Sequence, residues 1–136
     1  MRFIVLVKGN EQSEGGQMPD KSELEQMETF NEQLEREGIL RAAEGLQPTS
    51  AGARIDFGTN GPAVKHGPFE VRGGVAGFWI IETASLQAAI DAMKRAPFKQ
   101  GQIELRPLAE AEDFAFAPEV VKREKALRAK LDRRPS

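Results

Sequence analysis

The chain has 136 residues, the usual size of one domain, and its 19 basic and 21 acidic side chains give a formal net charge of -2 at pH 7. It contains no cysteine, no tyrosine, one histidine and one tryptophan. This composition excludes a thiol nucleophile, a disulfide framework, cysteine-ligated metal sites and a tyrosine acid. A catalytic serine could use only His66 as its base, and a metal centre with two histidines would need a second subunit.

The first predicted element is a strand over residues 3–7, which are all apolar. A continuous apolar run of this length is typical of a strand that is buried on both faces. The run ends at Lys8 and is too short for a signal peptide or for a membrane span, which needs about 18 apolar residues. Since no later stretch reaches that length and the chain lacks cysteine, we expect a cytoplasmic protein without a membrane partner.

A helix is predicted from Asp20 to the residue before Gly38. Asp20 has the side chain of an N-cap, and Glu23 stands three residues later, as in a capping box. An apolar stripe runs along one side of this helix, and Gly38 suits the left-handed residue that follows a helix end. Residues 9–19, which contain two adjacent glycines, are predicted to form a loop before the helix.

Five further segments have strand patterns: residues 39–44, 53–57, 63–66, 75–82 and 102–106. The segment 58–61 (GTNG) separates the second from the third and predicts a hairpin. Between the last two strands, Ser85 is the expected N-cap of a second helix whose inner stripe ends at Met93. A loop is predicted over residues 97–101.

The order of these elements, with the hairpin set aside, is βαββαβ, the ferredoxin-like pattern of the α+β class. Two helices can cover only one face of such a sheet, yet the strands over residues 3–7 and 75–81 are apolar on both faces. A sheet face exposed to water forgoes about 25 cal/mol of stabilising free energy for each Å² of apolar surface. A second copy packed sheet against sheet would bury this face. We therefore predict a symmetric homodimer.

A C-terminal helical arm, residues 117–136, is predicted to follow the domain of residues 1–116. Pro118 suits the first position of its helix, and Val120, Leu127 and Leu131 form a narrow apolar stripe that can grip the partner.

Charge is distributed unevenly between the arm and the rest of the chain. Residues 118–136 carry seven basic and three acidic side chains, or +4, whereas residues 1–117 carry 12 basic and 18 acidic side chains, or -6. A basic tail can bind nucleic acid, or it can be a solvated helix that docks on an acidic surface. Because no aromatic side chain lies between the basic residues to stack on bases, we favour the docking helix over a nucleic-acid partner.

An ordered series of short segments resembles the YCII-related family, and specifically its DGPF-domain branch. The segments are FIVLVK (3–8), EGLQP (44–48), GPF (67–69), GFWI (77–80), IELR (103–106) and EAEDF (110–114). The resemblance covers about residues 2–116. It implies a dimeric α+β barrel of ferredoxin-like protomers, with a small pocket between sheet and helices, and an association of some members with extracytoplasmic-function sigma factors.

The chain departs from the branch at its signature. His66 stands where the family usually has an aspartate before Gly-Pro-Phe. The wider family carries a His–Asp pair proposed as catalytic, but no histidine occupies the helix region where that pair would begin, so the pair is not carried over.

Two residues are candidate catalytic groups. His66 is the only side chain whose ordinary pKa lies near neutrality, so it is either a proton shuttle or a polar residue at a hairpin end. Glu44 ends a strand beside Gly45 and is either a base, if burial raises its pKa, or a partner for a basic side chain.

Four residues are candidate ligand-binding groups. Glu104 and Arg106 share one strand face, where Arg106 can hold a carboxylate at the dimer centre, or the two can pair with each other or across the interface. Trp79 can stack on a ligand or belong to the core. Phe69 can line a binding loop or plug a rigid Gly-Pro turn.

No metal and no cofactor is predicted. The acidic residues Glu110, Glu112 and Asp113 lack the spacing of a calcium loop, and the glycine pairs at 15–16 and 73–74 lack a phosphate-loop pattern.

Two functions follow as hypotheses. The first is small-molecule binding in a dimeric barrel, with or without cofactor-free enzyme activity, where Glu44, His66, Trp79 and Arg106 converge after folding. The alternative is a regulatory or interaction module linked to transcription, in which the basic arm binds a protein partner.

Overall fold

The computed structural model describes residues 1–133, so the last part of the predicted arm, including Arg134, lies outside the described residues. The strands are β1 (Arg2–Lys8), β2 (Leu40–Gly45), β3 (Ala53–Asp56), β4 (Ala63–His66), β5 (Val75–Glu82) and β6 (Ile103–Pro107). The helices are α1 (Glu11–Glu14), α2 (Lys21–Arg36), α3 (Leu86–Met93) and α4 (Pro118–Asp132), with short 3-10 turns η1 (Thr49–Ala51) and η2 (Ala111–Phe114).

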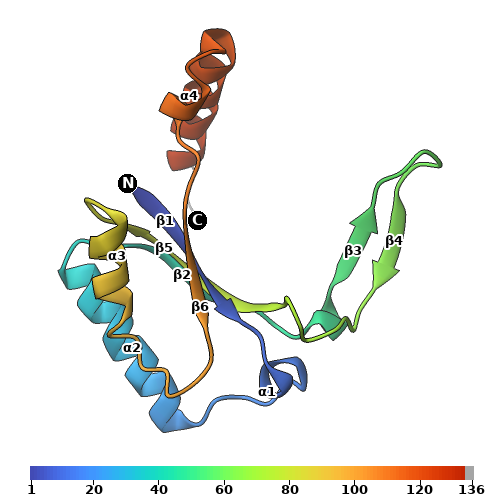
Figure 1. Ribbon diagram of the computed structural model, residues 1–136, viewed down its shortest axis with the longest axis vertical. Helices are drawn as coiled ribbons and strands as arrows, with labels where there is room; N and C mark the ends of the chain where they lie inside the picture. The colour runs from blue at the N-terminus through green and yellow to red at the C-terminus, as the bar shows by residue number, and fades with distance from the viewer. Residues whose placement is uncertain (134–136) are drawn as a thin grey trace.

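Four of the strands form one antiparallel sheet in the order β2-β5-β1-β6. The strands β3 and β4 form a separate hairpin that projects from one end of the sheet (Figure 1). This strand order, with α2 and α3 as the two crossovers, is the ferredoxin-like arrangement. The predicted α+β class and the βαββαβ order with an inserted hairpin are therefore confirmed.

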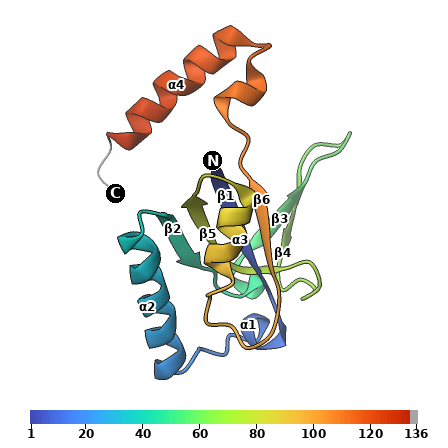
Figure 2. The same ribbon diagram turned by 60° about the vertical axis from the view of Figure 1, so that its left-hand side comes forward.

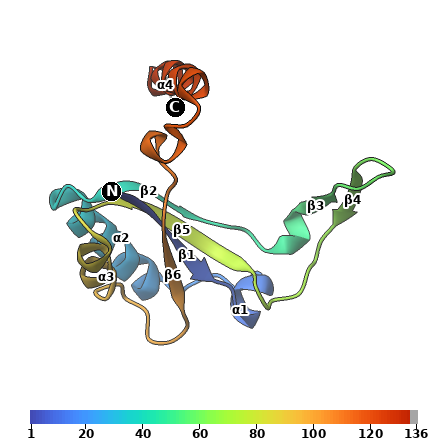
Figure 3. The ribbon, with the colours of Figure 1, turned by 45° about the horizontal axis from the view of Figure 1, so that its top comes forward.

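The core lies between the sheet and the helices α2 and α3, which cover the same face (Figure 3). Alternate residues of the strands point into it, because successive side chains of a strand face opposite sides. Its buried members are Phe3 and Val5 of β1, Phe30 and Leu34 of α2, Trp79 and Ile81 of β5, and Ala89, Ala92 and Met93 of α3.

Both covering helices begin at their predicted N-caps, and α2 ends just before the glycine predicted to follow it. The Asp20 side chain accepts a hydrogen bond from the Glu23 N–H at 2.8 Å, and Gly38, with φ +74°, follows the end of α2. Ser85 caps α3 by accepting from the Ala88 N–H at 3.1 Å. Local side-chain chemistry therefore determines these boundaries.

The predicted loop over residues 9–19 contains a short helix instead. Asn10 and Ser13 cap α1 reciprocally, each side chain accepting from the other residue's N–H at 2.9 Å. Since α1 has four residues and none is buried, it has no apolar periodicity that a sequence pattern could reveal.

The opposite face of the sheet, which α2 and α3 do not cover, is here called the open face. Its apolar members are Ile4 and Leu6 of β1 and Phe78 and Ile80 of β5. They are partly exposed, whereas Phe3, Val5, Trp79 and Ile81 on the other face are buried. The two apolar faces that the sequence predicts for β1 and β5 are thus present, and one of them is uncovered within the described residues.

Ion pairs surround the open face. Lys8 Nζ lies 3.1 Å from Glu104 Oε1, and Arg41 Nη2 lies 3.6 Å from Glu82 Oε2. Arg2 donates to both oxygens of Glu110 at 2.9 and 3.1 Å, and these hydrogen bonds lower the pKa of the Glu110 carboxyl. Several charged side chains around the open face are therefore paired, while the centre of the face is apolar.

The helix α4 begins at Pro118, the predicted first position of the helix in the arm, and it stands apart from α2 and α3 (Figure 1, Figure 2). None of its residues is buried. Val120, Leu127 and Leu131 are 58, 58 and 55% exposed, so the predicted stripe exists but has no partner within residues 1–133. Across the same residues, no helix has both the length and the apolar character needed to cross a membrane.

The Gly-Pro-Phe segment forms a turn that packs on η1. The Phe69 N–H donates to Thr49 Oγ1 at 2.9 Å, and the Gly67 N–H donates to the Gly52 carbonyl at 3.0 Å. The peptide bond from Gly67 to Pro68 is cis. A Cβ at Gly67 would lie 1.9 Å from the Thr49 carbonyl oxygen, so only glycine fits there. The Gly-Pro-Phe turn and η1, which are about 20 residues apart in the sequence, thus pack directly on each other.

Glu14 of α1 completes this contact. Its carboxylate accepts from the Thr49 hydroxyl at 2.5 Å and from the Thr49 N–H at 3.0 Å. These two hydrogen bonds lower the pKa of Glu14.

We predict that Gly67→Ala loosens the base of the hairpin. The new Cβ must displace the Thr49 backbone, which costs about 1–3 kcal/mol. Trypsin should therefore cleave at Arg54 and Lys65 faster than in the wild type. Gly58→Ala is the matched control, because a Cβ there meets nothing within 4 Å. Equal cleavage of the two variants would contradict the packing role of Gly67.

We also predict a stability difference that depends on pH. Since folding lowers the pKa of Glu14 below its ordinary 4.5, its stabilising effect is present above that value and is lost as the pH falls through the lower folded value. Glu14→Gln should unfold at lower urea than the wild type at pH 7, and the difference should shrink below pH 4.5. Glu11→Gln, which removes no hydrogen bond of the described residues, should behave as the wild type; a constant difference for Glu14→Gln at all pH values would contradict this account.

Candidate ligand-binding site

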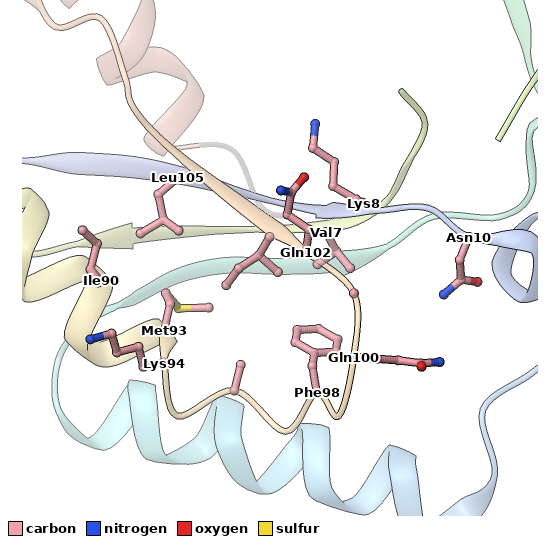
Figure 4. Close-up of a pocket in the computed structure, with 13 residues that line it drawn as sticks. Val7, Lys8, Asn10, Ile90, Met93, Lys94, Phe98, Gln100, Gln102 and Leu105 are labelled. Atoms are coloured by element: carbon pink, nitrogen blue, oxygen red, sulfur yellow. The ribbon is translucent and has the colours of Figure 1, made fainter. Parts of the chain in front are cut away.

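A cavity of about 350 Å³ lies between α3, the loop after it, β6 and the end of β1 (Figure 4). This volume is in the range of small-molecule sites. The cavity is on the helix-covered side of the sheet, where the family resemblance implies a pocket. Its lining residues are Val7, Lys8, Asn10, Ile90, Met93, Lys94, Ala96, Phe98, Gln100, Gly101, Gln102, Ile103 and Leu105.

The apolar wall of the cavity is formed by residues that share one face of β6 and one side of α3. Ile103 and Leu105 are two residues apart on β6 and therefore point to the same face. Ile90 and Met93 are three residues apart on α3 and share one side of the helix. Figure 4 shows Met93 and Leu105 pointing toward the same space, with the ring of Phe98 below them.

Phe98 is supported from behind by Trp79. The two rings meet edge to face with centroids 6.0 Å apart. Trp79 is itself 4% exposed, and its indole N–H donates to Asn31 Oδ1 at 2.7 Å. The tryptophan therefore belongs to the core and holds the wall of the cavity without lining it.

The polar lining residues are amides and lysines, with no carboxylate and no imidazole. Figure 4 shows Lys8 and Gln102 directed away from the cavity, and Lys8 pairs with Glu104. For Lys94, no ion pair is found within residues 1–133. The interior of the cavity can therefore enclose an apolar group, and it offers neither a carboxylate nor an imidazole for proton transfer.

A second hollow of about 440 Å³ lies along α2, beside Arg95 and Pro97. Most of its walls are polar side chains of one helix surface: Ser22, Glu25, Gln26, Thr29 and Gln33, with Phe30 beneath. Arg95 is already engaged, because it donates to both oxygens of Glu37 at 2.8 and 2.9 Å and lowers the pKa of that carboxyl. This hollow has fewer apolar lining residues than the first cavity, so it is the weaker candidate for a ligand site.

None of the predicted site residues lines either hollow. Glu44, Glu104 and Arg106 lie on the open face, opposite Phe78, Leu6 and Ile4 respectively in the strand register. Glu104 pairs with Lys8 rather than with Arg106. Glu44 and Arg106 stand on the two edge strands β2 and β6, at opposite sides of the sheet.

The other predicted residues lie elsewhere. His66 is exposed at the end of β4, paired with Ala53 in the hairpin ladder. Phe69 is partly buried in its turn, with the Arg54 guanidinium 4.0 Å from its ring centroid. The structure thus does not bring Glu44, His66, Trp79 and Arg106 together around one cavity, and the chemical roles proposed for them stay predictions.

The residues that line the cavity carried no chemical signal in the sequence. Met93, Ile103 and Leu105 fit the inner stripe or inner face of their elements, and Phe98 and Gln100 fall in a segment recognised only as a loop. Across residues 1–133, no cluster of three or more histidine, aspartate or glutamate side chains is arranged to hold a metal ion. Glu110 and Asp113 instead cap η2, where the Glu110 N–H donates to Asp113 Oδ2 at 2.7 Å.

Comparison with known proteins gives a family match and a similarity to a solved structure. A search of curated proteins found no match. Among solved structures, the chain is similar to 5-chloro-2-hydroxyhydroquinone dehydrochlorinase from Burkholderia phenoliruptrix in complex with 2,5-dihydroxybenzoquinone, with 13% identity, a TM-score of 0.45, and coverage of 81% of this chain and 95% of that one. The YCII-related domain matches residues 1–112, from β1 into η2. The chain therefore belongs to the YCII-related domain family.

Proposed function

We propose that this protein binds a small, mainly apolar organic molecule in the cavity between α3 and β6. The observation that carries the proposal is the cavity itself, about 350 Å³ in volume and walled by Val7, Met93, Phe98 and Leu105. An apolar ligand gains free energy by leaving water for such a wall. Because the lining includes Lys94, for which no ion pair is found within residues 1–133, and no carboxylate, it favours a neutral or anionic ligand over a cationic one.

Binding is the activity that the lining supports best. A cofactor-free reaction in the cavity would need a proton donor or acceptor within hydrogen-bond reach of the substrate. The lysines are the only ionisable side chains among the lining residues. Nothing in the structure or in the comparisons favours the alternative function linked to transcription.

We also propose that two copies associate through their open faces. Ile4, Leu6, Phe78 and Ile80 form an apolar centre that two apposed sheets would bury. Glu44 and Arg106 then lie at the edges of this interface, where Arg106 can pair with a carboxylate across it. The dimer is the barrel that the resemblance implies.

We further propose a family branch, a domain division and a cellular location for this protein. The Gly67-Pro68-Phe69 turn supports membership of the DGPF-domain branch, with His66 in place of the usual aspartate. The lack of buried residues in α4 supports a division into a domain of residues 1–116 and an arm of residues 117–136. The cysteine-free composition is compatible with a cytoplasmic location.

The cavity predicts a selective ligand response. Benzyl alcohol, benzoate and benzylamine share one ring and differ in charge, so we expect NMR shift changes at Phe98 and Leu105 with the first two and the weakest with benzylamine. Ala96→Phe should fill the cavity and abolish these changes. Ala84→Phe, an exposed position outside the lining, is the matched control. Unchanged binding to Ala96→Phe would place the ligand elsewhere and overturn the proposal.

The proposed dimer predicts a mass of twice 15.0 kDa by light scattering at micromolar concentration. Phe78→Glu places a charge at the centre of the open face and should give a folded monomer. Leu24→Glu, at a 51% exposed position of α2, should remain dimeric. A wild-type mass of 15.0 kDa would refute the dimer.

A further inference from the structure

The β3–β4 hairpin buries none of its strand residues within residues 1–133. All the residues of both strands are exposed. Ile55 and Val64 face each other across the ladder and are 53 and 58% exposed, and Phe57 just beyond β3 is 83% exposed. A two-stranded hairpin alone is at best marginally stable in water. Its apolar side chains therefore need cover from outside the chain.

The C-terminal helix α4 is in the same condition. It has 15 residues, none of them buried. Val120, Leu127 and Leu131 are spaced along one side of the helix, and all are more than half exposed. An isolated helix of this length is marginal in water, because most helices in proteins are stabilised by packing of an apolar side.

These two projecting elements flank the open face. In Figure 1 and Figure 3, α4 rises over one end of the sheet and the hairpin extends from the other end, while α2 and α3 lie on the opposite side. Both elements thus project from the sheet domain on the side that α2 and α3 do not cover. One occupant seated on the open face can contact this face and both elements.

The size of the sheet leaves room for the projecting elements to enlarge the interface. Four strands spaced about 4.8 Å apart and about 20 Å long span roughly 400 Å² of flat area. A standard interface buries about 800 Å² of accessible surface on each partner. Contacts made by α4 and the hairpin would add to the surface that the open face buries.

Charge favours a second copy of this chain as the occupant. Residues 118–136 carry a net charge of +4 and residues 1–117 carry -6. Within residues 1–133, the ion pair that involves α4 joins Arg128 to Glu124 of the same helix, and none joins α4 to the sheet domain. A second copy brings a domain of net negative charge to this basic helix, and two-fold symmetry repeats the contact.

We propose that α4 and the β3–β4 hairpin of each copy reach across the interface and pack on the partner copy. The inference rests on the proposed dimer and adds to it the elements that hold the two copies together. Leu127 and Leu131 of α4 and Ile55 and Val64 of the hairpin are the side chains that the partner covers.

Substitutions at exposed positions test this without disturbing the core. Leu127→Asp combined with Leu131→Asp should raise the dimer dissociation constant about tenfold or more in sedimentation velocity. Ala126→Asp combined with Ala129→Asp adds the same charge on the other side of α4 and is the control. Ile55→Thr combined with Val64→Thr keeps the strand propensity and should also weaken the dimer.

A second measurement uses the absence of cysteine in the wild-type chain. A Leu131→Cys variant labelled with a photoactivatable cross-linker should join to an unlabelled chain and give a product of twice 15.0 kDa. Cross-linking only within one chain would overturn the inference, as would unchanged dissociation constants for the α4 and hairpin variants. Those results with a dimeric wild type would leave the sheet-to-sheet dimer standing, whereas a monomeric wild type would remove both proposals.

Discussion

The structure depends on the alternation of side chains along β1 and β5, the two central strands of the sheet. Successive side chains of a strand point to opposite faces, and β1 and β5 carry apolar residues on both faces. Each face of the sheet therefore needs a partner that buries it. The helices α2 and α3 cover one face and bury Phe3, Val5, Trp79 and Ile81. The same alternation that builds the core leaves Ile4, Leu6, Phe78 and Ile80 uncovered, and the proposed assembly follows from that surplus.

The cavity arises from the unequal lengths of the two covering helices. The helix α2 has 16 residues and α3 has eight, which is about 12 Å of helix. The edge strand β6 is therefore covered by α3 only in part, and the loop of residues 97–101 closes the remaining side with Phe98. Because Trp79 packs against Phe98 from the core, the wall of the cavity is continuous with the hydrophobic core.

The Gly-Pro-Phe segment and the projecting hairpin have a structural explanation that is independent of catalysis. Gly67 is required by the approach of the Thr49 carbonyl, and Thr49 is held by Glu14. This contact fixes the base of the hairpin beside the open face. The Gly-Pro-Phe motif thus has a structural role, because it holds the base of the β3–β4 hairpin that precedes it.

The sequence by itself determined the elements, their order and the sides they bury. Those properties depend on neighbours along the chain: apolar periodicity, the caps Asp20 and Ser85, and the left-handed Gly38. The sequence did not reveal α1, because no residue of this helix is buried and it has no apolar periodicity. It did not reveal the cavity either, because the wall consists of ordinary apolar side chains without a recognisable motif. Only the tertiary structure decided which side chains meet, because contacts between strands depend on register and sheet order. That is why Glu104 pairs with Lys8, why Trp79 belongs to the core, and why Glu44 and Arg106 stand at opposite edges of one sheet.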